Sequence, residues 1–283
     1  MTANRAASIR ARLKRHADAT KEDFNLILTR YGLERLLYRL SISKHAPDFI
    51  LKGALLFQLW YGNAHRPTQD ADLLGFGPDD AATLVETFRS ICTVQIDDGV
   101  VFDPDSIRGT EIRRNASYGG VRVDVRATLD SARIALQVDV GFGDVVTPHP
   151  QPILYPTLLG DMPAPNLRIY PKTSVIAEKL HAVCVLGVTN SRMKDFFDLW
   201  VLLHDSAIDD NELVEAIAAT FSRRATALPD GVPDGLSDAF AADAARRIQW
   251  RAFLKKNDLD IHELGEVITF IRTRFLAVIT GRT

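Results

Sequence analysis

The sequence predicts an α+β protein in which a helical lead-in and a C-terminal helical part flank a mixed sheet. Apolar residues recur every three or four positions over residues 6–43 and again from residue 172 onward, which is the spacing of amphipathic helices. Between them, the stretches VRVDVRATL and IALQVDVGFGD alternate apolar and polar residues, as half-buried strands do. Successive strands that pair with one another favour an α+β domain over a regular βαβ array.

The composition is that of an ordinary globular protein, with 46% hydrophobic and 25% charged residues in 283. The net charge of −2 excludes a strongly basic protein, although a local basic face stays compatible with it. Cys92 and Cys184 lie far apart among apolar residues, so we expect reduced, buried thiols. The N-terminus lacks the apolar core of a secretory signal and no apolar run reaches membrane-spanning length, so we expect a cytoplasmic protein without a membrane partner.

The helical lead-in carries a cap signal and a basic cluster. Thr20 followed by Asp23 predicts a helix N-terminal cap with an acidic residue in the first turn. We interpret the basic cluster as a solvated helix face, with contact to an RNA backbone as the alternative; it consists of Arg5, Arg10, Arg12, Lys14 and Arg15.

Residues 49–77 are the most informative stretch of the chain. An apolar run leads into Lys52-Gly53, a helical segment spans residues 54–61, and a polar turn delivers Thr68-Gln69-Asp70-Ala71-Asp72. Residues two apart on a strand point to the same face, so Asp70 and Asp72 present both carboxylates to one side while Ala71 and Leu73 face the core.

Two neighbouring carboxylates repel each other unless a cation lies between them. Mg²⁺ takes oxygen ligands of this kind and commonly keeps nucleotide phosphates as its remaining ligands. Gly53 precedes a helix, where backbone N–H groups can approach a phosphate without a Cβ in the way. These residues predict a metal-dependent nucleotide site.

The middle of the chain predicts a helix from Asp80 to about Cys92, followed by strands at residues 94–96, 101–102, 106–113, 120–129 and 134–140. Asp124 and Asp139 lie within apolar strands, where an unpaired charge is costly, so at least one of them needs compensation. For Asp124 we favour a strand carboxylate facing water, and for Asp144 a turn residue.

Seven prolines between residues 148 and 171 predict an extended connection, and we place a domain boundary near Pro165. The predicted parts are residues 1–45, 46–164 and 165–283. The last part contains a helix from Lys172 and a second from residue 191 to about His204.

On the second of these helices, Lys194 and Asp198 are four apart and can pair with each other, while His181 on the first is assigned to packing. Residues 211–283 are predicted to be helical around a loop at 228–233. Their basic residues are candidate RNA contacts with Trp250 among them, or else a solvated face; they are Arg223, Arg224, Arg246, Arg247, Arg251, Lys255 and Lys256.

Three motifs resemble a known family. The stretch LKGALL…RPTQDADLL resembles the opening signature of polymerase-β-like nucleotidyltransferases, in the form found in the AbiEii/AbiGii toxins, and EKLHA…RMKDFFDLW and QVDVGFGD resemble that family's later motifs. The chain departs from the superfamily in having Gly53-Ala54 where Gly-Gly or Gly-Ser is usual, which would affect a side-chain contact to phosphate but not the backbone contacts.

The resemblance implies a role for each site residue. Asp70, Asp72 and Asp139 would hold Mg²⁺, with Asp139 also activating the acceptor hydroxyl and Asp124 as the fallback. Lys179 would be catalytic and bind the nucleotide phosphates, and Asp195 would be a further catalytic residue. Asp198, which shares a motif with Lys194 and Asp195, would bind the nucleotide, as would Lys52, Gly53 and Thr68.

The resemblance further implies an NTP-dependent toxin of a bacterial toxin–antitoxin or abortive-infection system. It would act in phage defence by adding nucleotides to an RNA acceptor, in particular the tRNA 3′ end, and so block translation. A separately encoded antitoxin of the AbiEi type would be its partner. Two alternatives stay open: transfer to a protein side chain or small molecule, and a non-catalytic nucleotide-binding module.

Overall fold

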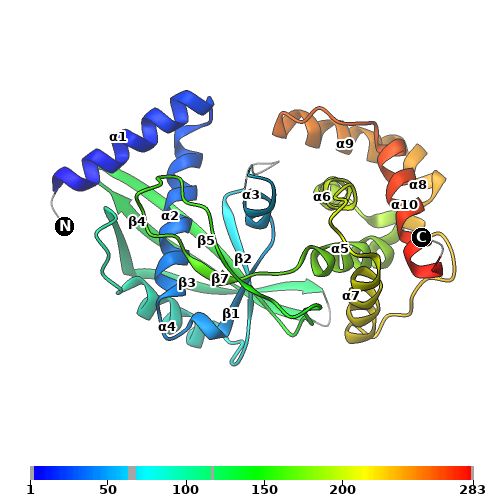
Figure 1. The fold of residues 1–283 in the computed structure, drawn as a ribbon, viewed down its shortest axis with the longest axis horizontal. Coiled ribbons are helices and arrows are strands. Elements are labelled where there is room, and N and C mark those ends of the chain that lie inside the picture. The colour runs from blue at the N-terminus through cyan, green and yellow to red at the C-terminus, as the bar shows by residue number, and fades with distance from the viewer. Residues whose placement is uncertain (1–2, 63–67, 116–117, 282–283) are drawn as a thin grey trace. The chain divides into compact units, whose positions relative to one another are not determined.

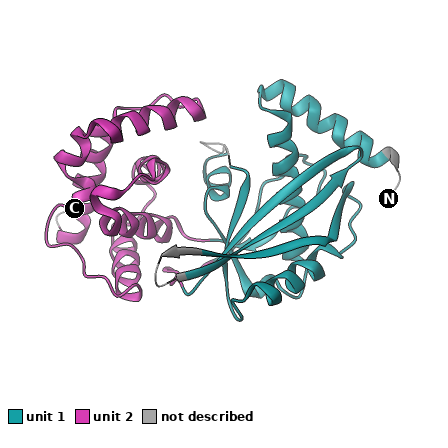
Figure 2. Ribbon diagram, turned by 180° about the vertical axis from the view of Figure 1, so that it is seen from behind, with its two compact units in different colours: residues 1–143, 151–169 teal, residues 144–150, 170–283 magenta. Residues whose placement is uncertain are grey.

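A computed structural model describes residues 3–62, 68–115 and 118–281. Compactness divides the chain into two units (Figure 2): unit 1 contains residues 1–143 and 151–169, and unit 2 contains residues 144–150 and 170–283. The chain thus passes between the units three times, whereas the sequence analysis placed one boundary near Pro165, between its second and third parts. The predicted division into three parts stays a prediction.

Unit 1 is built on a five-stranded mixed sheet of order β1-β2-β5-β4-β3 (Figure 1). Strands β2 and β5 run parallel, and the other neighbours in this sheet are antiparallel. The strands are β1 (Phe49–Lys52), β2 (Asp70–Gly75), β3 (Val100–Asn115), β4 (Tyr118–Leu129) and β5 (Ala132–Phe142). The predicted α+β class is therefore confirmed.

Helices cover one face of this sheet. The helices of unit 1 are α1 (Ala3–Thr20), α2 (Phe24–Ser41), α3 (Leu55–Tyr61) and α4 (Ala81–Cys92). Helix α2 packs on β5 at Gly32, where a Cβ would lie 2.9 Å from Leu136 Cδ2, and α4 packs on β3 at Gly109. On β5, Ile134 and Leu136 are buried on the covered face, while the alternating residues Arg133 and Ala135 are exposed.

Three predictions about unit 1 are corrected. Residues 94–96 form no strand, because β4 ends at Leu129, which already pairs with Val100. The strands expected at 101–102 and 106–113 are one strand, β3, with an irregular register between Asp103 and Arg108. The N-cap of α2 is Asp23 itself, whose carboxylate accepts from the Leu26 N–H, whereas Thr20 ends α1.

The proline-rich segment forms a short antiparallel pair, β6 (Pro152–Leu154) and β7 (Asn166–Arg168).

Unit 2 is helical, as predicted. Its helices are α5 (Lys172–Leu186), α6 (Met193–Leu203), α7 (Asp210–Arg223), α8 (Asp238–Ala242), α9 (Ala244–Asn257) and α10 (Leu264–Thr280). Their apolar stripes meet in a core that includes Leu180, Phe196, Trp250 and Phe275. Cys92 and Cys184 are free thiols, and burial raises the pKa of each to about 12. No helix in the described parts of the chain is long and apolar enough to cross a membrane.

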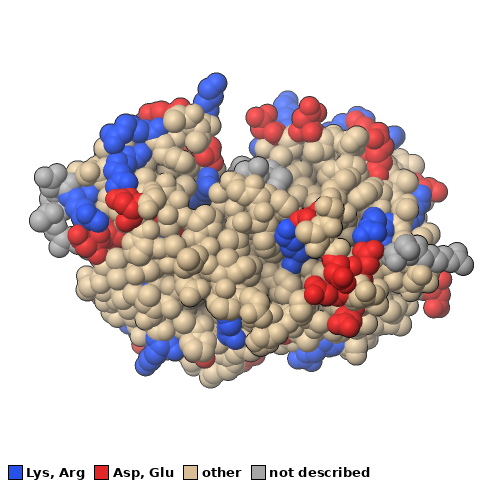
Figure 3. All heavy atoms as spheres, viewed as in Figure 1, with Lys and Arg blue, Asp and Glu red and all other residues tan. Residues whose placement is uncertain are grey.

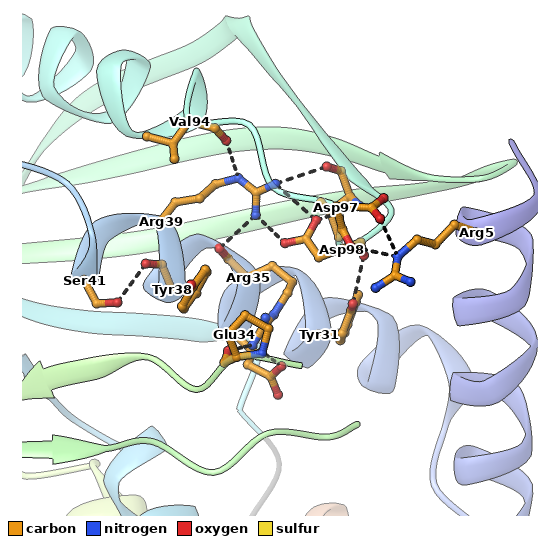
Figure 4. Close-up of polar contacts among 12 residues, drawn as sticks. Arg5, Tyr31, Glu34, Arg35, Tyr38, Arg39, Ser41, Val94, Asp97 and Asp98 are labelled. Atoms are coloured by element: carbon orange, nitrogen blue, oxygen red, sulfur yellow. Dashed lines mark hydrogen bonds and ion pairs between the residues drawn. The ribbon is translucent and has the colours of Figure 1, made fainter. Parts of the chain in front are cut away.

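A buried ion pair ties α2 to the loop before β3 (Figure 4). Arg39 donates to both carboxylate oxygens of Asp98 at 2.6 and 3.1 Å and to the Val94 carbonyl at 3.0 Å, and both charged side chains are almost fully buried. The Tyr31 hydroxyl donates to the Asp98 carbonyl at 2.8 Å. Removing one partner of such a pair leaves an uncompensated buried charge.

We therefore expect Arg39→Met to lower the free energy of unfolding by about 3–5 kcal/mol, measured by chemical denaturation. The matched control is Arg251→Met, because Arg251 pairs with Glu263 while both side chains are exposed. That control should lose less than about 1 kcal/mol. Equal losses in the two variants would contradict this account of the buried pair.

His181 of α5 is a packing residue, as predicted, and it makes stability depend on pH. Its ring lies edge-on to Phe221 with 5.0 Å between centroids, and its Nε2 lies 3.0 Å from the Thr226 hydroxyl. Burial, reinforced by the positive charge of Arg224, lowers the pKa of His181 from 6.5 to about 4.

Because the unfolded chain binds the His181 proton at a higher pH than the folded chain does, the free energy of unfolding should fall as pH drops from about 6.5 to about 4. The loss amounts to at most about 3 kcal/mol. Comparing His181→Asn with wild type by denaturation across this range should show a shallower decline in the variant. The partly exposed His16, changed to Asn, is the control and should leave the decline unchanged.

Candidate active site

The parallel pairing of β2 with β5 brings three predicted carboxylates onto one face of the sheet. Asp72 lies opposite Asp139 and Asp70 opposite Gln137 in the register. Residues that are paired across neighbouring strands project to the same face. Asp70 and Asp72 are half-buried while Ala71 and Leu73 are fully buried, so the predicted orientation of β2 is confirmed.

A row of charged residues crosses the sheet at this point. The successive register partners are Lys52 on β1, Asp72 on β2, Asp139 on β5 and Arg122 on β4. Neighbouring strands are about 4.8 Å apart, so the two carboxylates are close enough to repel each other strongly. A cationic residue stands at each end of this pair, which offsets the repulsion.

Arg122 compensates Asp139 directly. Its Nε and Nη2 donate to the two carboxylate oxygens of Asp139 at 2.9 and 3.1 Å, and Asp139 is only 5% exposed. This hydrogen bonding raises the pKa of the Arg122 guanidinium above its ordinary value. Asp124, in contrast, is exposed, as expected for a strand carboxylate facing water.

Arg122 had no assigned role in the sequence analysis. The signal for it is the alternation in VRVDVRATL, which places Arg122, Asp124 and Arg126 on one face of a strand. Which carboxylate lies beside Arg122 is decided by the register of β4 on β5, and that register is a tertiary property.

Gly53 is required by Asp72. Its φ is +79°, and a Cβ built there would lie 2.1 Å from Asp72 Oδ2. The carboxylate of Asp72 therefore rests on the Gly53 backbone, in space that any side chain would fill. The Thr68 hydroxyl donates to Asp70 Oδ1 at 2.7 Å, and both Thr68 and Lys52 are largely buried.

The residues predicted from the later motif meet in unit 2. Lys179 on α5 places its Nζ 2.9 Å from Asp195 Oδ1 and 2.8 Å from Asp198 Oδ2, both on α6. The two aspartates are buried, and Arg192, which the sequence analysis left without a role, lies 2.7 Å from Asp195 Oδ2. Two buried carboxylates are thus balanced by two cations, as burial of charge requires.

The alternative in which Lys194 and Asp198 simply pair with each other on the helix surface is wrong. Asp198 lies on the buried side of α6 and pairs with Lys179, whereas Lys194 is exposed. The predicted site residues therefore form two groups, one in each unit: Lys52, Gly53, Thr68, Asp70, Asp72 and Asp139 in unit 1, and Lys179, Asp195 and Asp198 in unit 2.

Three carboxylates that supply only oxygen atoms suit a hard divalent cation such as Mg²⁺. The close contact with the Gly53 backbone fixes the carboxylate of Asp72, and the hydrogen bond from Thr68 orients that of Asp70. Within the described residues, however, no three His, Cys, Asp or Glu side chains are gathered as a metal site. Arg122 holds both oxygens of Asp139 here, so the donor set fits the cation once that contact opens.

Several residues of the predicted basic surfaces form ion pairs, and one predicted member is buried. Trp250 is fully buried and donates to the His262 carbonyl, so the prediction that it lies among RNA contacts is wrong. Asp144 is more than a turn residue, since Arg224 lies 2.8 Å from it and 3.7 Å from Glu178. In Figure 3, basic and acidic side chains lie interspersed on the visible face. The N-terminal cluster is likewise paired, through Arg5–Asp97, Arg10–Asp130, Arg12–Asp161 and Lys14–Asp18.

Two solved structures share this fold. The nucleotidyltransferase toxin MenT4 (Rv2826c) of Mycobacterium tuberculosis is 19% identical, with a TM-score of 0.53 over 97% of this chain and 99% of that one. JHP933 of Helicobacter pylori is 15% identical, with a TM-score of 0.50 over 90% of this chain and 92% of that one. None of the curated proteins compared with the chain matches it.

A family model describes most of the chain. The model of the nucleotidyl transferase AbiEii toxin of type IV toxin–antitoxin systems matches residues 35–270. This range includes both groups of site residues. The chain therefore belongs to the AbiEii family of nucleotidyltransferase toxins.

Proposed function

We propose that this toxin transfers a nucleotide from an NTP to an RNA acceptor, the tRNA 3′ end, in a Mg²⁺-dependent reaction that blocks translation. The observation that carries the proposal is the row in which Asp72 and Asp139 lie side by side, with Asp70 two residues along the same strand face. These carboxylates supply only oxygen atoms, the ligands that a hard divalent cation prefers, and a bound cation would add to the compensation that Lys52 and Arg122 provide. The toxin would act in the cytoplasm, with a separately encoded antitoxin of the AbiEi type as its partner.

Each residue has a proposed role. Asp70, Asp72 and Asp139 would hold Mg²⁺, which when bound supplies charge stabilisation for the reacting phosphate. Asp139 would accept the proton of the acceptor hydroxyl, since it is the carboxylate contributed by the neighbouring strand β5. Gly53 and Thr68 keep the carboxylates of β2 in place through the contacts described above. Lys52 would bind the nucleotide.

Lys179 would bind the triphosphate. Its ammonium group is held between Asp195 and Asp198, and 16% of its side chain is exposed. Its two aspartate neighbours restrict the position of the amine, which suits a point charge that has to meet phosphate oxygens. Asp195 and Asp198 would therefore support catalysis by orienting Lys179.

Incubating the protein with Mg²⁺, each labelled NTP in turn and total tRNA tests the proposed reaction. We expect label on tRNA with one preferred NTP, and at least a roughly 100-fold loss in Asp70→Ala and Asp139→Asn, because each removes an oxygen ligand from the reacting group. Asp124→Ala is the matched control, since Asp124 is an exposed carboxylate on the same face. It should transfer at the wild-type rate.

Other outcomes would replace the proposal. Label on the toxin itself or on added protein would indicate nucleotidylation of side chains. NTP binding without transfer to any acceptor would indicate a non-catalytic nucleotide-binding module. Equal losses in Asp124→Ala and Asp139→Asn would contradict the role given to Asp139.

Gly53→Ala tests whether the position of the Asp72 carboxylate depends on the absence of a side chain at residue 53. The new Cβ would displace the Asp72 carboxylate, and a shift of about 1 Å in a reacting group costs about 100-fold in rate. Gly77→Ala is the control, because Gly77 also has positive φ, +97°, while a Cβ added there would meet no atom of the described residues within 4 Å. Both variants should lose about 1–3 kcal/mol of stability, measured by denaturation. Only Gly53→Ala should lose transfer; equal transfer rates would show that Asp72 does not depend on Gly53.

A further inference from the structure

Arg122 binds the carboxylate of Asp139, which the proposed reaction requires as a metal ligand. Its guanidinium takes both oxygens of Asp139 in a bidentate contact, at 2.9 and 3.1 Å. The side chain of Arg122 is 39% exposed, whereas that of Asp139 is only 7% exposed, so the arginine lies on the solvent side of the pair. A cation that approaches Asp139 from solvent therefore meets Arg122 first.

A second acceptor is available to the same guanidinium. With its amide oxygen turned toward Arg122, Gln137 accepts from Nη2 at 3.1 Å and from Nε at 3.2 Å. Gln137 is two residues before Asp139 on β5 and projects to the same face of the sheet. Arg122 can thus give up Asp139 and keep hydrogen bonds to Gln137, so that opening the ion pair leaves these guanidinium donors satisfied.

The charges favour exchange between Arg122 and a divalent cation. The lone pairs that Arg122 uses are those that an oxygen-seeking cation would use. Loss of the Arg122 contact leaves less compensation for the buried charge of Asp139 beside Asp72, and such a charge is unfavourable. A divalent ion that replaces Arg122 restores this compensation with twice the charge.

We propose that Arg122 is a positioning residue which serves as the resident counter-cation of Asp139 and competes with the divalent cation for it. Arg122 holds the Asp139 carboxylate in position when no cation is bound, and it sets the cation concentration at which Asp139 becomes a metal ligand. This inference rests on the proposed function, in which Asp139 is a metal ligand.

Titrating the nucleotide-free protein with Mn²⁺, followed by electron paramagnetic resonance of the free ion, measures this competition without any catalytic turnover. Arg122→Gln should bind Mn²⁺ on the order of tenfold more tightly than wild type, because the competing bidentate contact is gone. Arg122→Lys keeps the charge but makes only single contacts, so its Kd should lie between the two.

Arg126→Gln is the matched control. Arg126 is an exposed arginine on the same strand and the same face, four residues from Arg122. Four residues of strand span about 13 Å, which exceeds the Debye length of about 10 Å. The Kd of Arg126→Gln should therefore stay within about twofold of wild type, which separates direct competition from a general change of charge.

Thermal unfolding provides a second measurement. Without a divalent cation, Arg122→Gln should melt below wild type, because Asp139 loses its arginine partner, and Mg²⁺ should raise its midpoint by more than it raises that of wild type. A Mn²⁺ Kd in Arg122→Gln that equals or exceeds the wild-type value would overturn the inference. If Asp70→Ala binds Mn²⁺ with the wild-type Kd, the metal site of the proposed function is refuted as well. If Asp70→Ala weakens Mn²⁺ binding but Arg122→Gln leaves the Kd unchanged, only the competition by Arg122 is refuted.

Discussion

The parallel pairing of β2 with β5 is the constraint on which the candidate site depends. It sets Asp72 directly beside Asp139, and the side-chain period of two then brings Asp70 to the same face. A shift of β2 by one residue would turn Asp70 and Asp72 into the apolar core under α2 and leave Asp139 on the other face. The buried residues Ala71, Leu73, Val138 and Val140 between them resist such a shift, so core packing and site geometry are fixed by the same pairing.

Compensation of buried carboxylates recurs in both units. Arg39 neutralises Asp98, Arg122 neutralises Asp139, and Lys179 with Arg192 neutralises two aspartates of α6. The first pair is almost wholly buried and serves the fold. The other two keep a partly exposed cation over a buried acid, an arrangement in which a ligand can displace or recruit the cation. The cations of these two groups are therefore more accessible to a ligand than Arg39 is.

The family assignment and the geometry support each other from independent directions. The family model covers residues 35–270 from sequence pattern alone, and the sheet then brings the motif carboxylates of distant strands together. MenT4 and JHP933 share the fold at 19% and 15% identity, which shows that this architecture tolerates wide change in sequence. The shared fold therefore does not identify the reaction or the acceptor of this toxin, and these have to be tested through its own site residues.

The sequence by itself determined the local features. Periodicity predicted the helices of unit 2, alternation predicted β4 and β5, and the spacing of Asp70 and Asp72 predicted their shared face, because all of these depend on near neighbours in the chain. Only the tertiary structure decided which distant residues meet. Strand register brings Arg122 to Asp139, and helix packing buries Trp250 and makes Lys179, not Lys194, the partner of Asp198. Residue spacing along the chain does not determine strand register or helix packing.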